Sequence, residues 1–81
     1  MPTTKAIRAE NVQSLHRGME ILKSFNRETP RLTLTEVATI TGLSRATARR
    51  FLITLTNLGY VGNPNRYFYL RPKILELGNS Y

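Results

Sequence analysis

Apolar residues recur at helical spacing near the start of the chain. The first stripe repeats at i, i+4, i+7 and i+10 and consists of Leu15, Met19, Leu22 and Phe25. This spacing places them on one side of a helix, which we expect to run from Ser14, as its N-cap, to about Phe25. Ile21 lies off the stripe, where it would widen the buried face or meet a second subunit. Gly18 either costs ~1 kcal/mol of helix propensity or allows close packing at a dimer seam.

A second, shorter helix follows a loop at residues 26–31. Its start is marked by Thr33 and Glu36, which form a capping box: each side chain accepts a hydrogen bond from the backbone N–H of the other residue. We expect the helix at about 34–41, ended by Gly42, because glycine adopts the left-handed C′ conformation at little cost. Its predicted inward side chains are Leu34 and Val37, with Ile40 as a further candidate.

The third helix has one apolar face and one face rich in arginine. Ser44 is its expected N-cap and Gly59 its C′ residue, so the helix runs to about Leu58. At about 100° per residue, the apolar face consists of Ala48, Phe51, Leu52, Leu55 and Leu58. The opposite face consists of Ala46, Arg49, Arg50, Ile53 and Asn57.

The rest of the chain predicts a β-hairpin and the start of a fourth helix. Residues 60–61 are expected to form a short strand, 63–65 a tight turn, and the aromatic run 66–70 a returning strand with Phe68 and Leu70 inward. Pro72 suits the first turn of a helix, where its missing N–H would have no partner. This order of elements is that of a winged helix-turn-helix: a mostly α fold with a three-helix core, a small β wing and the start of a linker helix.

The chain is therefore divided into three segments. Residues 1–11 are polar and are expected to form a flexible N-terminal arm, and residues 12–71 form the winged domain. Residues 72–81 begin an apolar pattern that stops with the chain, which predicts a linker helix leading to an absent domain. A domain of this size has a thin core, so a partner or a dimer interface would add stability.

The net positive charge of the chain narrows the range of partners it could bind. The chain has 12 Lys and Arg residues against five acids, a net charge of +7 and a pI of about 10.6. Between Glu36 and Glu76 there is no acid, and the six basic residues of this window are Arg45, Arg49, Arg50, Arg66, Arg71 and Lys73. Because carboxylates repel phosphates and arginines attract them, the window favours binding to a polyanion such as double-stranded DNA.

The third helix is the predicted recognition helix, whose N-terminal half would place side chains on base edges in the major groove. The candidate DNA contacts are Ser44, Arg45, Ala46, Thr47, Arg49 and Arg50 on this helix and Arg66 after the hairpin turn. Arginine can pair with guanine or bind phosphate, and the sequence does not decide between these roles. Ala46 could contact a thymine methyl, Thr47 could donate to phosphate, and Arg66 would reach the flanking backbone or the minor groove.

Several other classes of protein are disfavoured. The chain has no cysteine and one histidine, so it offers neither a cysteine-based zinc site nor a nucleophile–base–acid set, and it lacks a glycine-rich phosphate loop. We expect no catalytic residue, no metal and no cofactor. No apolar run approaches the roughly 18–20 residues of a transmembrane helix, so we expect no membrane contact and a cytoplasmic protein.

Three segments carry a family resemblance: VQSLHRGMEILKSF, LTLTEVATITGLSRATARRFLITLTNLGYV and YFYLRPKILELG. Together they resemble, over about residues 12–78, the N-terminal domain of the IclR family of bacterial transcriptional regulators. The pattern S-x-x-T-x-x-R from Ser44 and the pattern L-x-x-L-G-Y from Leu55 are typical of this family. The RRFL run at 49–52 and the opening VQSL at 12–15 resemble the subgroup that regulates aromatic-acid catabolism, such as the protocatechuate or β-ketoadipate pathway.

The resemblance implies a homodimer, paired through the first helix and the linker helix, that binds palindromic operators on the bacterial nucleoid. It also implies a small-molecule effector that binds only through a missing C-terminal domain, and it carries over Ser44, Thr47 and Arg50 as DNA contacts. Two alternatives stay open: a winged helix for protein–protein assembly with only non-specific nucleic-acid affinity, and an RNA-binding module. The RNA alternative ranks last, because only Tyr67 and Tyr69 could serve as stacking residues.

Overall fold

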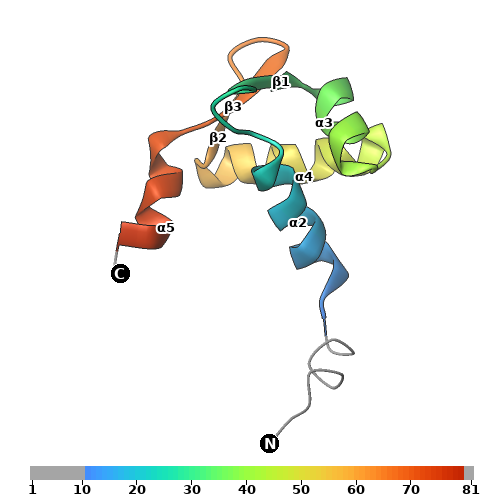
Figure 1. Cartoon of the computed structure of the whole chain (residues 1–81), viewed down its shortest axis with the longest axis horizontal. Helices are drawn as coiled ribbons and strands as arrows, with labels where there is room; N and C mark the ends of the chain where they lie inside the picture. The colour runs from blue at the N-terminus through green and yellow to red at the C-terminus, as the bar shows by residue number, and fades with distance from the viewer. Residues whose placement is uncertain (1–10, 80–81) are drawn as a thin grey trace, which may run out of the picture.

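The computed structural model describes residues 11–79, so the expected arm at 1–11 lies almost wholly outside the described residues. In chain order the elements are α2 (Gln13–Lys23), β1 (Arg31–Thr33), α3 (Leu34–Thr41), α4 (Arg45–Leu58), β2 (Val61–Gly62), β3 (Tyr67–Leu70), the 3-10 helix η1 (Pro72–Leu75) and α5 (Glu76–Asn79). Figure 1 shows α4 crossing beneath the small sheet, while α2 and α5 both extend away from the sheet. The predicted winged helix-turn-helix fold is confirmed.

Both helices of the helix-turn-helix begin where their caps predict. The Thr33 hydroxyl accepts from the Glu36 N–H at 3.2 Å, and the Glu36 carboxylate accepts from the Thr33 N–H at 2.8 Å. Ser44 Oγ accepts from the backbone N–H of Thr47 at 3.1 Å. Each helix ends at a glycine with left-handed backbone, Gly42 (φ 74°) for α3 and Gly59 (φ 90°) for α4.

The core lies where α2, α3 and α4 meet the inner face of the sheet. Its buried apolar residues are Ile21, Phe25, Leu32, Val37, Ala38, Ala48, Leu52, Val61 and Phe68. Leu43, in the turn between α3 and α4, packs against this core. Two predicted inward residues are exposed instead, Ile40 on α3 and Leu58 in the last turn of α4. Ala38 takes the inward position on α3, because the helix turns that side toward the core.

The predicted orientation of the first helix is wrong at Leu15 and Met19, whereas Phe25 of the stripe is buried as expected. Leu15 and Met19 of the expected stripe are 67% and 49% exposed, whereas Ile21, placed off the stripe, is fully buried. The Ser14 cap is also wrong: the His16 N–H donates to the Val12 carbonyl, which starts the helix earlier, and no side chain caps it. Nothing among the described residues covers the side of α2 that carries Leu15 and Met19, so these two side chains face solvent.

The inward side of α2 is set by its contact with α4. A Cβ at Gly18 would lie 3.8 Å from Phe51 of α4, and Ile21 and Phe25 follow on the same side of the helix. Gly18 therefore faces a helix of its own chain.

The wing is a three-stranded antiparallel sheet in the order β1-β3-β2, not the predicted two-stranded hairpin. The added strand, β1, occupies the end of the segment predicted as a loop, and its Leu32 is a buried partner of Phe68. Tyr60 and Arg66, expected inside strands, lie just before β2 and β3. β1 has only three residues, from Arg31 to the Thr33 cap, which are too few to show strand alternation, so β1 was not predicted.

The expected fourth helix begins as a 3-10 turn. Pro72 occupies its first turn, as predicted, and α5 continues it only from Glu76 to Asn79. Lys73 ties this segment to the recognition helix: its Nζ donates to the Leu58 carbonyl at 3.1 Å and lies 5.3 Å from the centre of the Tyr60 ring. Across residues 11–79, no helix is long and apolar enough to span a membrane.

Candidate nucleic-acid interface

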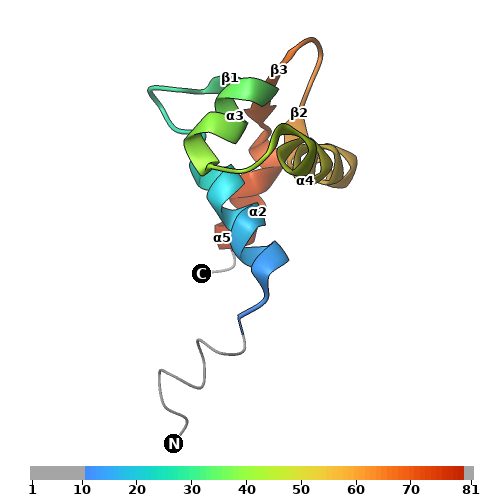
Figure 2. The same ribbon diagram turned by 90° about the vertical axis from the view of Figure 1, so that its right-hand side faces the viewer.

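One face of α4 stands free of the rest of the domain. In Figure 2, which looks roughly along α4, the wing lies to one side of this helix and the start of α2 to the other. The predicted contacts on this face that are exposed to solvent are Arg45, Ala46, Arg49 and Arg50. Because about 100° separates consecutive residues of a helix, Arg45 falls toward one flank of the face and Arg50 toward the other.

Ser44 and Thr47 are joined at the start of α4. The Ser44 hydroxyl accepts from the Thr47 N–H and donates to Thr47 Oγ1 at 2.9 Å. Ser44 is thus occupied as a cap, while Thr47 keeps its own hydroxyl proton for another acceptor. This arrangement suits a phosphate contact by Thr47, because a hydroxyl can donate and accept at once.

A hollow of about 370 Å³ lies on the wing side of α4. The residues that line this wing-side hollow are Thr33, Leu34, Thr35, Arg45 and Arg66. The fold therefore brings together two predicted contacts, Arg45 and Arg66, that are 21 positions apart in the sequence. Together they place two guanidinium groups around one depression at the start of α3.

Glu36, the last acid before the acid-free window, adds a negative charge near Arg66 of this hollow. The pKa of its carboxyl is lowered, first by the hydrogen bond from the Thr33 backbone, then by the Thr33 side chain, and also by the charge of Arg66. The carboxylate is engaged by the capping box, which holds it at the helix start.

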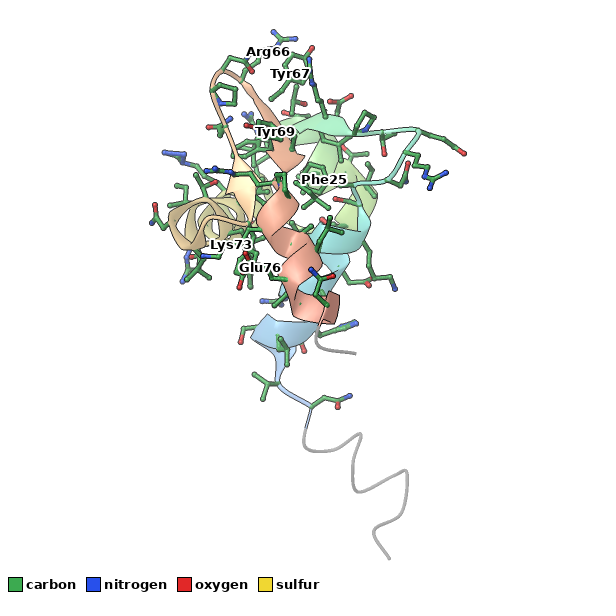
Figure 3. All side chains as sticks on the ribbon, turned by 90° about the vertical axis from the view of Figure 1, so that its left-hand side faces the viewer. Phe25, Arg66, Tyr67, Tyr69, Lys73 and Glu76 are labelled. Atoms are coloured by element: carbon green, nitrogen blue, oxygen red, sulfur yellow. The ribbon has the colours of Figure 1, made fainter. Side chains whose placement is uncertain are left out.

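The wing tip is braced by asparagine side chains. Asn63 Nδ2 donates to the carbonyls of Asn65 at 2.6 Å and Tyr67 at 2.8 Å, and Asn65 Oδ1 accepts from the Tyr67 N–H at 2.8 Å. The Arg66 guanidinium lies 5.3 Å from the centre of the Tyr67 ring. Figure 3 shows Arg66 and Tyr67 together at the tip, away from Lys73 and Glu76. The cation–π contact positions an exposed arginine without removing its charge.

A second hollow, of about 350 Å³, lies on the α2 side of α4. The residues that line this α2-side hollow are Ser14, Arg17, Thr47, Arg50, Phe51 and Thr54. Arg17 and Thr54 were not among the predicted contacts. No local pattern marks Arg17, since its relevance depends on how α2 packs against α4. Ala46 and Arg49 line neither hollow and stand between the two on the exposed face.

Within the described part of the chain, no arginine of this surface lies within ion-pair distance of a carboxylate. Among residues 11–79, the one ion pair joins Lys23 to Glu20 at 3.5 Å, and it lies at the far end of α2. Unpaired guanidinium groups around an exposed helix favour attraction of an anionic partner.

The sequence also matches a known family. Residues 14–63 match the IclR helix-turn-helix domain. The chain is 49% identical over 78 residues to the Pca operon regulatory protein of Acinetobacter baylyi, covering 95% of this chain and 28% of that protein. It is 39% identical over 80 residues to the p-hydroxybenzoate hydroxylase transcriptional activator of the same organism, covering 98% of this chain and 30% of that protein.

Solved structures agree with this match. The crystal structure of a Rhodococcus sp. RHA1 protein assigned to the transcriptional regulators has a TM-score of 0.83 and 52% identity, covering 88% of this chain and 28% of that one. The chain thus spans less than a third of the length of each of these proteins. The relatives do not favour the assembly alternative, since both are named as regulators of transcription. The chain belongs to the IclR family, of which it forms the DNA-binding helix-turn-helix domain of a transcriptional regulator.

Proposed function

We propose that α4 enters the major groove of a palindromic operator. The observation that carries this proposal is the exposed arginine face of α4, which lies between two arginine-lined hollows. Arg49 and Arg50 approach the base edges or the groove walls, Ala46 allows close approach of the helix backbone, and Thr47 donates to phosphate. Arg66, held over Tyr67 at the wing tip, binds the flanking backbone.

The domain acts as a homodimer in this proposal. Five of its exposed apolar side chains lie on the two segments that extend away from the wing: Val12, Leu15 and Met19 at α2, and Leu75 and Leu77 at η1 and α5. Burial of these exposed apolar groups against a second copy would be favourable, because it removes apolar surface from water. The segment from Pro72 onward then begins the linker to an effector-binding domain.

The effector and the regulated genes are inferred from the relatives. Two curated relatives are named for the Pca operon and for p-hydroxybenzoate hydroxylase, and the latter substrate is an aromatic acid. We infer that the complete protein regulates aromatic-acid catabolism in the bacterial cytoplasm, acting on the nucleoid. Its small-molecule effector binds in the part of the protein outside this sequence, and regulation rather than catalysis is its activity.

Binding to DNA tests the proposal directly. A palindromic duplex selected from a random pool and an unselected duplex are titrated with the domain at two salt concentrations, with fluorescence anisotropy as the readout. We expect a preference of at least tenfold for the selected duplex, about 1.4 kcal/mol, that persists at the higher salt. Equal affinities that fall together with salt would mean counterion-release binding only and would contradict base readout.

Arg50→Ala supplies the residue-level test, with Arg27→Ala as its matched control. Both substitutions remove one exposed guanidinium, but Arg27 lies in the loop between α2 and β1, which Figure 2 shows on the opposite side from α4. Loss of the charge-assisted contact of Arg50, whether to a base edge or to the groove wall, is expected to weaken binding of the selected duplex by about 1.5–3 kcal/mol. Wild-type affinity in Arg50→Ala would rule out its assignment.

A further inference from the structure

We propose that Arg17, on the first helix, binds a DNA backbone phosphate in the α2-side hollow together with Arg50. This inference rests on the proposed docking of α4 in the major groove and adds a contact from outside the helix-turn-helix motif. It assigns α2 a second role besides packing against the core.

The lining of the hollow supplies the chemistry. Two guanidinium groups come from different helices, Arg17 from α2 and Arg50 from α4, and the hydroxyl groups of Ser14, Thr47 and Thr54 border the same depression. Of these, Thr54 donates to the Arg50 carbonyl at 3.0 Å, while Thr47 receives a hydrogen bond from Ser44 and keeps its proton. Phe51 supplies the apolar part of the lining. The side chains of Arg17, Arg50, Ser14 and Thr47 keep donors for a phosphodiester oxygen, and no carboxylate lines this hollow.

The nearest acid to consider is Glu20, one turn along α2. Arg17 and Glu20 both border a smaller hollow on another side of this helix. The Glu20 carboxylate, however, lies 3.5 Å from Lys23 Nζ. Arg17 has no carboxylate within ion-pair distance among residues 11–79. Its charge is therefore available to an anion.

The position of the hollow fits the geometry of DNA. A helix in the major groove has a sugar-phosphate backbone on each side, one from each strand. The wing-side hollow holds Arg45 and Arg66, and the α2-side hollow holds Arg17 and Arg50, on opposite flanks of α4. Arg17 would therefore bind the strand away from the wing, and the two hollows together would fix the depth and direction of α4.

The test compares Arg17→Ala, Arg17→Lys and the control Arg27→Ala, each titrated against the selected and the unselected duplex over a range of salt. Because a phosphate carries no sequence information, we expect Arg17→Ala to weaken both duplexes by the same factor, about tenfold. The slope of log K against log salt should fall by about 0.9, the value for one phosphate, and Arg17→Lys should restore most of the slope. Circular dichroism and thermal melting confirm that each variant is folded.

The possible outcomes separate the two proposals. An Arg17→Ala affinity within twofold of Arg27→Ala would overturn the phosphate site while leaving the proposed function intact. Loss of affinity for the selected duplex alone would also overturn it, because Arg17 would then read bases. A wild-type domain that prefers no sequence would instead contradict the proposed function, whatever Arg17 does.

Discussion

Ile21 is the side chain whose substitution most directly tests the packing of α2. Its side chain is fully buried, whereas that of Leu15, six residues earlier on the same helix, is 67% exposed. Replacing Ile21 by alanine removes three carbon atoms, worth about 2.4 kcal/mol at ~0.8 kcal/mol for each buried CH₂. The cavity left behind raises the expected cost to about 3–4 kcal/mol. Ile21→Val removes one carbon and should cost about 1 kcal/mol.

These costs are large compared with the stability of so small a domain. At roughly 0.05–0.15 kcal/mol per residue, a chain of this length is stabilised by about 4–12 kcal/mol. Ile21→Ala is expected to leave a substantial unfolded fraction, so Ile21→Val gives the cleaner measurement. Urea unfolding followed by far-UV circular dichroism provides the free energy of unfolding, and an unchanged m-value indicates that the denatured state is unaltered.

Leu15→Ala is the matched control, since it removes a similar number of carbon atoms from the same helix. At low protein concentration we expect it to cost less than about 0.5 kcal/mol. A cost that appears only at high concentration would indicate that Leu15 lies in the dimer interface. Equal costs for Leu15→Ala and Ile21→Ala at low concentration would refute the observed orientation and favour the original stripe.

Two further substitutions test single contacts. Gly18→Ala should stabilise the domain by about 1 kcal/mol, measured by thermal melting, because the new Cβ meets Phe51 at an ordinary 3.8 Å; a lower melting temperature would show that α2 and α4 are closer than observed. Glu36→Gln removes a carboxyl whose pKa is lowered from its ordinary value of 4.5 by the Thr33 hydrogen bonds and Arg66. Because the folded pKa is lowered, the carboxylate stabilises the fold above pH 4.5 and loses this effect as pH falls through the folded pKa. Urea unfolding between pH 7 and pH 3 should therefore show wild type losing its advantage over Glu36→Gln, and a pH-independent difference would contradict this.

Local chemistry explains what could be predicted from the sequence. The limits of α3 and α4 follow from the capping residues Thr33 and Ser44 and from the left-handed glycines Gly42 and Gly59. Each of these signals acts within four residues of the helix end, so it is visible without knowledge of the tertiary structure. The arginine face of α4 was predictable for the same reason, because its position opposite the apolar face depends only on helical period.

The remaining features depend on contacts between distant parts of the chain. The inward side of α2 is decided by Phe51, which Gly18 faces across the helix pair, and an apolar stripe alone does not show which face another helix covers. β1 is a strand because Leu32 pairs with Phe68, which lies 36 positions later in the sequence. Arg17 enters the candidate site only through the packing of α2 against α4. These are long-range contacts, for which one sequence carries no direct signal.

The structure of α2 reconciles its apolar stripe with its place beside the DNA-binding surface. One side, with Gly18 and Ile21, packs against the core, while Leu15 and Arg17 are two residues and therefore about 200° apart around the helix. Pairing with a second copy through Leu15 would thus leave the Arg17 side free to face DNA. Under the two proposals, Leu15 and Met19 of the stripe would face a second subunit while Arg17 binds a phosphate on the other side of the same helix.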